Sequence, residues 1–123
     1  MNLSPALKEA YTKEQLSAPD AQRLAEFIAW GPVVFQVSRL MIKFGILNLL
    51  RDNPEGLTQQ QIADSTKLSL YAVKVLTEAS LSIGTVLVDP ETERFSLSKT
   101  GWFLLTNPIT RVNIDFNHDV NYI

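Results

Sequence analysis

The segment from residue 33 to residue 52 constrains the fold most, because its apolar side chains cover more of a helix than one neighbour can bury. Its only strongly polar stripe before the last turn is formed by Gln36, Arg39 and Lys43. A surface helix of a small domain needs an apolar stripe only about 100° wide. The sequence therefore predicts one long helix that is buried on two sides, with a partner chain covering the second side. The apolar residues of the segment are Val34, Phe35, Val37, Leu40, Met41, Phe44, Ile46, Leu47 and Leu50.

The same segment has nearly the length of a membrane span, which needs about 20 apolar residues. Arg39 and Lys43 lie in its middle, and each would cost about 2.5 to 3.5 kcal/mol at the centre of a helix in lipid. We therefore expect no membrane contact. The first residues lack the basic start and the apolar run of a signal peptide, so the expected compartment is the cytoplasm.

A shorter helix is predicted ahead of this segment, from residue 21 to residue 30. Asp20 suits its N-cap, because an aspartate side chain accepts hydrogen bonds from the first turn. Gly31 and Pro32 then break the chain, and proline also suits the first position of the next helix. Gly45 is expected inside that next helix, at a cost of about 1 kcal/mol relative to alanine. One face of the shorter helix carries Leu24, Phe27 and Ile28.

Residues 57–97 have the pattern of a winged helix-turn-helix. Thr58 and Gln61 are spaced as a capping box, in which each side chain bonds to the backbone of the other residue at a helix start. Ser69 is a suitable cap for a second short helix. Gly84 suits the left-handed residue that ends it.

Two short strands are predicted at residues 85–88 and 94–97, joined by a loose turn. Ser98 or Thr100 would begin a last helix before Asn107-Pro108, and residues 109–123 show no clear period. The predicted fold class is mainly α. It is a winged helix-turn-helix with a small β-hairpin, preceded by long apolar dimerisation helices.

The charge of this region disfavours DNA as a partner. Duplex binding depends mainly on lysine and arginine side chains that neutralise phosphates. Residues 57–83 carry two basic and two acidic side chains, and residues 84–97 carry one basic and three acidic ones. The whole chain has a net charge of -2. Nucleic acid is therefore not the expected partner, although a winged-helix transcription regulator remains the alternative.

The sequence offers little for catalysis. It contains no cysteine, no glycine-rich nucleotide motif and no H-E-x-x-H zinc motif. His118 is the only histidine, and Asp115 would share a helical face with it as an acid–base pair or half of a metal site. A polar tail segment is the simpler interpretation, so we predict no catalytic, cofactor-binding or metal-binding residue. Aromatic side chains at helical spacing line a small-molecule pocket or, more often, pack in a core or an interface. Both interpretations remain open for Trp30, Phe35, Phe44, Trp102 and Phe103.

Several short motifs follow one another in a fixed order between about residues 20 and 106. They are Phe44–Leu50, Leu57-Thr58 with Ile62-Ala63, Ala72–Leu76, Ile83-Gly84, Arg94–Ser98 and Thr100-Gly101. Together they resemble the N-terminal dimerisation domain of small-molecule S-adenosylmethionine-dependent O-methyltransferases. One departure is that Ser65-Thr66-Lys67 replaces the glycine usually found between the two short helices.

The resemblance implies a domain that is nearly free of catalytic residues and whose helices intertwine with those of a second subunit. It also implies that the domain helps to close a substrate pocket. A following Rossmann-like domain would bind the methyl donor at a glycine-rich loop. Because this chain ends at Ile123 before any such loop, it is expected to be a non-catalytic fragment. S-adenosylmethionine and a small hydroxylated acceptor are expected for the parent enzyme only.

Three segments are therefore expected: an N-terminal arm at 1–19, a winged-helix dimerisation domain at 20–106, and at 107–123 the start of a linker toward a catalytic domain. The expected partner is a second copy of the chain. A standalone protein-interaction module is a further alternative. The predicted dimer interface consists of Phe27, Trp30, Val34, Phe35, Val37, Leu40, Met41 and Phe44.

Overall fold

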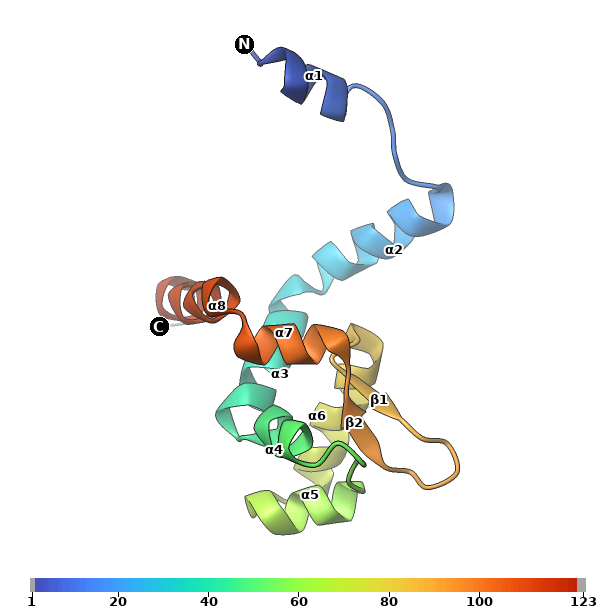
Figure 1. Cartoon of the computed structure of the whole chain (residues 1–123), viewed down its shortest axis with the longest axis vertical. Coiled ribbons are helices and arrows are strands. Elements are labelled where there is room, and N and C mark those ends of the chain that lie inside the picture. The colour runs from blue at the N-terminus through green and yellow to red at the C-terminus, as the bar shows by residue number, and fades with distance from the viewer. Residues whose placement is uncertain (1, 122–123) are drawn as a thin grey trace. The chain divides into compact units, whose positions relative to one another are not determined.

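The computed structural model describes residues 2–121. The chain divides into two compact units, Met1–Pro32 and Val33–Ile123. It is mainly helical with one two-stranded hairpin (Figure 1), so the predicted fold class is confirmed. The elements are α1 (Pro5–Tyr11), α2 (Ala18–Ala29), α3 (Gly31–Lys43), α4 (Ile46–Asp52), α5 (Gln59–Thr66), α6 (Leu70–Ile83), β1 (Val86–Val88), β2 (Phe95–Leu97), α7 (Lys99–Thr106) and α8 (Pro108–Asn121).

The first unit contains α1 and α2, and neither helix has a buried residue. Ser17, not Asp20, is the N-cap of α2, and its side chain accepts a hydrogen bond of 3.3 Å from the Asp20 backbone N–H. The predicted N-cap was therefore wrong. Pro19 lies in the first turn, where the missing N–H of proline costs nothing, because that group has no partner within the helix.

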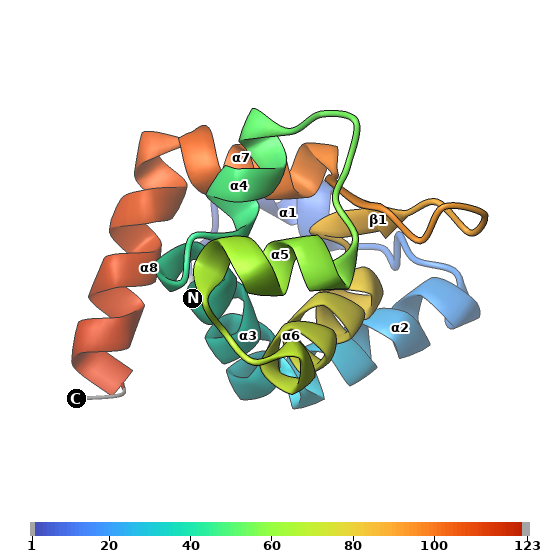
Figure 2. The same ribbon diagram turned by 90° about the horizontal axis from the view of Figure 1, so that it is seen from below.

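The second unit holds a contiguous apolar core. Helices α3, α4, α5, α6 and α7 and both strands contribute side chains to it. Figure 2 shows α4, α5 and α6 gathered around this region. The buried apolar residues are Met41, Ile46, Leu47, Leu50, Ile62, Ala63, Val73, Leu76, Val86, Phe95 and Leu105.

The predicted single helix over residues 33–52 is in fact two helices. Gly45 adopts a left-handed conformation with φ 77°, and α3 and α4 meet there at a bend of 58°. Glycine takes this conformation without the steric cost that a Cβ would add. The bend directs Ile46, Leu47 and Leu50 into the core of their own chain. The surplus of apolar surface is therefore smaller than a straight helix would leave.

The winged helix-turn-helix forms as predicted. Thr58 and Gln61 make both bonds of the capping box at the start of α5. Ser69 caps α6, and Gly84 ends it with φ 102°. Lys67 takes the left-handed position between the two helices, with φ 62°, in place of the glycine often found there.

The hairpin pairs β1 with β2 antiparallel, with Leu87 opposite Ser96. Leu57 extends this small sheet, because its backbone exchanges two hydrogen bonds with Phe95, of 2.9 and 2.7 Å. This link fastens the chain before α5 to the hairpin.

The C-terminal region differs from the expected aperiodic tail. Ser98 caps α7 as predicted, but α8 follows at once from Pro108 to Asn121. Asn107 begins it, because its side-chain oxygen accepts hydrogen bonds from the N–H groups of Ile109 at 3.0 Å and Thr110 at 3.3 Å.

Candidate dimer interface

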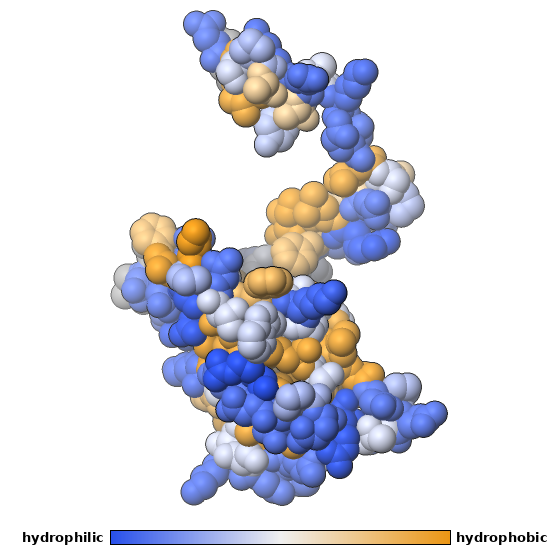
Figure 3. Space-filling view, viewed as in Figure 1, coloured by the Kyte–Doolittle hydropathy of each residue, from blue (hydrophilic) through white to orange (hydrophobic). Residues whose placement is uncertain are grey.

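Helix α2 presents an apolar face that its own unit does not cover. Leu24, Phe27 and Ile28 are 49%, 51% and 68% exposed, and Trp30 at the C-cap is 64% exposed. Figure 3 shows this helix divided into an apolar side and a polar side. An amphipathic helix of this kind is stable only where something covers its apolar stripe.

Helix α3 presents a second, separate set of the predicted interface residues. Val34, Phe35, Val37 and Leu40 are half-buried, and Phe44, in the turn that follows α3, is 40% exposed. Met41 is fully buried in the core of its own chain, so packing within one chain already accounts for its apolar side chain. The predicted set therefore contains exposed, half-buried and fully buried members.

Helix α8 exposes a third apolar face, which the sequence prediction missed. Ile109, Val112 and Phe116 are each more than half exposed. Their spacing of three and four residues places them on one face of the helix. This helical spacing could have been recognised in the sequence, although the polar residues between them, Asn113 included, weakened the pattern.

The free energy gained by burying the apolar face of α2 can be compared with the free energy lost when two chains associate. Completing the burial of a half-exposed large apolar side chain contributes roughly 1 kcal/mol. The four exposed α2 residues on each of two copies would contribute roughly 8 kcal/mol, against roughly 4–15 kcal/mol lost on association. The α2 face alone is therefore too small for a tight dimer, and further apolar surface must contribute.

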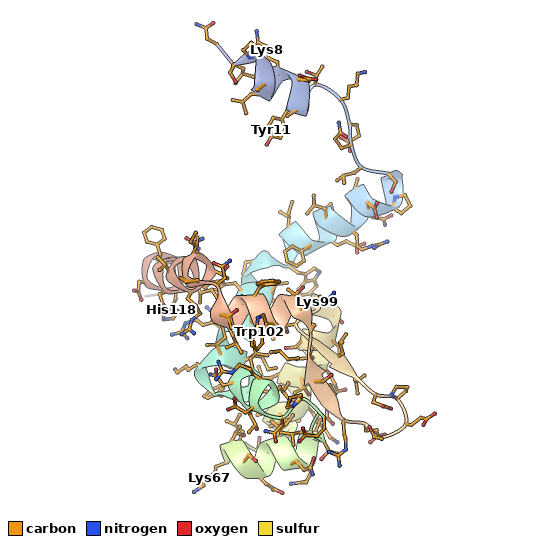
Figure 4. The ribbon with its side chains drawn as sticks, in the orientation of Figure 1. Lys8, Tyr11, Lys67, Lys99, Trp102 and His118 are labelled. Carbon is orange, nitrogen blue, oxygen red and sulfur yellow. The ribbon has the colours of Figure 1, made fainter. Side chains whose placement is uncertain are left out.

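The sequence candidates for catalysis lie on α8. His118 is half-buried and Asp115 is exposed, and Figure 4 places His118 on this helix. Within residues 2–121, no group of three or more histidine, cysteine, aspartate or glutamate side chains is arranged to hold a metal ion.

Among the candidate aromatic pocket residues, Trp102 lies on α7 (Figure 4). It lines a cleft of about 340 Å³ with Leu50, Pro54 and Leu97. Phe44 and Phe103 are exposed. The aromatic residues are thus distributed over several surfaces.

No single helix in the described part of the chain is long and apolar enough to cross a membrane. Helices α3 and α4 reach that length and apolar content only when they are joined across their bend.

Comparison of the sequence with known protein families identifies the family of this chain. The model of the Dimerisation2-like domain matches residues 22–95, which is more than half of the chain and includes α3 to β1. A comparison with curated proteins finds no match. The expected relationship to a dimerisation domain is confirmed, and the chain belongs to the Dimerisation2-like domain family.

Proposed function

We propose that this chain holds two protomers together as a homodimer, and that the apolar face of α2 lies at the centre of the interface. The observation that carries the proposal is that α2 exposes Leu24, Phe27, Ile28 and Trp30 in a unit with no buried helical residue. A second copy can supply the missing cover, since two-fold symmetry brings the same face of each protomer to the axis. Membership of a dimerisation domain family supports this choice of partner.

The exposed apolar residues of α3 and α8 supply the additional surface that the energy balance requires. Phe44, directly after α3, is 40% exposed, and Ile109, Val112 and Phe116 on α8 are 73%, 65% and 62% exposed. An obligate interface buries about 2,000 Å² or more, which is more than one short helix presents. The proposed dimer therefore uses more than one of these faces.

We further propose that the domain serves a methyltransferase that transfers a methyl group from S-adenosylmethionine to a hydroxyl of a small molecule, and that the enzyme is cytoplasmic. The order of motifs from Phe44 to Gly101 supports this, because it resembles that of O-methyltransferase dimerisation domains. In such an enzyme this domain would help to close the substrate pocket, while a separate domain would bind the methyl donor.

The dimer is tested by sedimentation equilibrium of Phe27→Asp. A charge at the centre of an apolar interface is unfavourable unless it is paired, so the variant is expected to sediment as a monomer. Because residues between Val37 and Leu105 form the core of the second unit, the variant should keep the helical circular dichroism of the winged helix.

The matched control is Tyr71→Asp, which places the same charge on an exposed aromatic residue in the first turn of α6. It is expected to sediment as the unsubstituted protein does. A Phe27→Asp protein that remains dimeric, or an unsubstituted chain that is a monomer at millimolar concentration, would overturn the proposal.

The methyltransferase assignment is tested separately, by calorimetric titration with S-adenosylmethionine. The chain of 123 residues is expected to bind no donor, and the full product of its gene is expected to bind one per subunit. Tight donor binding by residues 1–123 would contradict a separate donor domain. A full gene product that binds no donor would contradict the methyltransferase.

A further inference from the structure

A cleft of about 310 Å³ lies between the C-terminal half of α3, the start of α4 and the polar side of α8. All of these segments belong to the second unit, and Figure 2 shows α8 beside them. The lining residues are Arg39, Ile42, Lys43, Asn48, Arg111, Ile114 and Asp115. Two residues of the polar stripe on α3, Arg39 and Lys43, thus face this cleft.

The cleft concentrates positive charge in a chain whose net charge is negative. It holds three cations, Arg39, Lys43 and Arg111, against one carboxylate, that of Asp115. The ion pairs within 4.0 Å among the described residues are Arg23–Asp20 and Arg51–Asp52. The carboxylate of Asp115 therefore does not neutralise the three cations by direct pairing.

Most donor groups of the cleft make no hydrogen bond within residues 2–121. Arg39 is half-buried, and its guanidinium makes no hydrogen bond or ion pair within residues 2–121. The side-chain amide of Asn48 has no partner in that part of the chain either. Arg111 donates once, from Nη1 to the backbone oxygen of Leu105 at 3.3 Å, which fixes its position and leaves further N–H groups for a ligand.

We propose that this cleft is a binding site for a phosphate group, carried by a small phosphorylated molecule. Two guanidinium groups offer the planar, paired donors that match phosphate oxygens, and Lys43 adds a third cation. The excess of two positive charges balances a phosphate monoester, which carries about -1.5 to -2 near neutral pH. Ile42 and Ile114 provide apolar contact for the remainder of a small molecule.

None of the residues that line the cleft belongs to the exposed apolar residues that the proposed dimer uses, on α2 or near α3 and on α8. The proposed site therefore gives the domain a ligand in addition to its partner subunit. A dicarboxylate is the nearest competing ligand, since arginine also binds carboxylates in pairs. The test must therefore separate these two anions.

The experiment is calorimetric titration at constant ionic strength, with inorganic phosphate, glycerol 3-phosphate and succinate as probes. Inorganic phosphate is expected to bind the unsubstituted protein, and Arg39→Gln to weaken that binding at least about tenfold, the factor for 1.4 kcal/mol. Arg23→Gln is the matched control, since it removes the same charge from an exposed site on α2 and should leave the affinity unchanged.

Asp115→Asn is the more specific variant, because it removes from the cleft the one negative charge that repels phosphate. It should tighten phosphate binding several-fold. Lys43→Gln is a second loss variant at an exposed residue, for use should Arg39→Gln fail to fold. Tighter binding of glycerol 3-phosphate than of inorganic phosphate supports a phosphorylated small molecule as the ligand. Equal binding of the two would overturn this choice of ligand and would indicate a site for the free phosphate ion.

Three results would overturn the phosphate site itself. One is phosphate binding that is equal in the unsubstituted protein and in both loss variants. Another is tighter binding of succinate than of either phosphate compound. The last is weaker phosphate binding by Asp115→Asn.

Discussion

The backbone of Gly101 in α7 packs directly against the carbonyl oxygen of Thr85, the residue before β1. A Cβ at position 101 would overlap that oxygen and would also press on the side chain of Leu97. The same Thr85 oxygen accepts a hydrogen bond of 3.1 Å from the N–H of Ser98. The glycine is therefore required for close approach of the helix to the hairpin.

Gly101→Ala is expected to lower the free energy of unfolding by at least about 1–3 kcal/mol, the usual range for overpacking. The clash is with backbone, which cannot rotate away as a side chain can. Urea unfolding followed by circular dichroism measures the change. Gly31→Ala is the control, because nothing lies within 4 Å of its added Cβ, and it should be neutral or slightly stabilising. Equal stability of the two variants would contradict the close contact.

Removal of either of two buried hydroxyls on α6 should change the free energy of unfolding, in opposite directions for the two. The hydroxyl of Thr77 donates to the Val73 carbonyl at 2.7 Å and accepts from Gln59 at 3.1 Å. The hydroxyl of Ser80 is buried without a partner in the described chain. A buried polar group without a partner costs about 1–3 kcal/mol.

We therefore expect Ser80→Ala to raise the free energy of unfolding by about 1 kcal/mol and Thr77→Val to lower it by about 1 kcal/mol. Both substitutions remove one hydroxyl from the same helix, so each is a control for the other. Thermal unfolding at one protein concentration gives the comparison. A Ser80→Ala protein that is less stable by as much as Thr77→Val would show that the Ser80 hydroxyl has a partner.

The winged helix could be predicted because local chemistry determines its boundaries. Thr58 with Gln61, Ser69 and Gly84 each act on the backbone within three or four residues. Such signals are visible in sequence and are little changed by tertiary packing.

The bend at Gly45 could not be predicted in the same way. Apolar residues continue on both sides of it, so the periodicity of residues 33–52 fits a straight helix as well. The burial of Ile46 and Leu47 in the core favours the bend, and this packing involves residues distant in sequence. Helix α8 was missed for a different reason: Asn107-Pro108 was interpreted only as the end of α7, although the same pair also begins α8.

The predicted dimer interface stays a prediction, and the exposure of its residues could be predicted only in part. The exposure of Phe27 and Trp30 agrees with their place on an apolar face that a small domain leaves uncovered. Met41 is fully buried in a core that includes residues distant in sequence, which its helical position alone did not predict. The cationic cleft was missed because Arg39 and Lys43 become part of one site only when α8 brings Arg111 beside them.

Duplex DNA is expected to bind weakly. Helix α6 exposes Tyr71, Lys74 and Glu78, and the Glu78 carboxylate accepts a hydrogen bond from Gln59 at 3.2 Å. The hairpin tip is acidic, and the Asp89 carboxylate is held by two backbone N–H groups of the turn. Neither surface neutralises phosphates, which supply most duplex affinity.

Fluorescence anisotropy with a labelled duplex at low salt should therefore show no saturable binding below about 100 µM, the weak end of non-specific binding. The paired control replaces Glu91 and Glu93 with lysine and should gain binding that disappears as salt rises. Tight binding by the unsubstituted chain, with a steep salt dependence, would instead indicate a transcription regulator.

Helix α2 should be stable only in the dimer. It has 12 residues and buries none of them in its own unit, and isolated helices shorter than about 12–15 residues are marginal in water. Association shifts such an equilibrium by mass action, so α2 amides should exchange more slowly as protein concentration rises. Hydrogen exchange read by mass spectrometry measures this, with α6 amides as the internal reference, because their protection depends on the core of a single chain. In Phe27→Asp, α2 should exchange rapidly at every concentration. Slow, concentration-independent exchange of α2 in both proteins would mean that the helix is held without a second copy, and the proposed interface would then lie elsewhere.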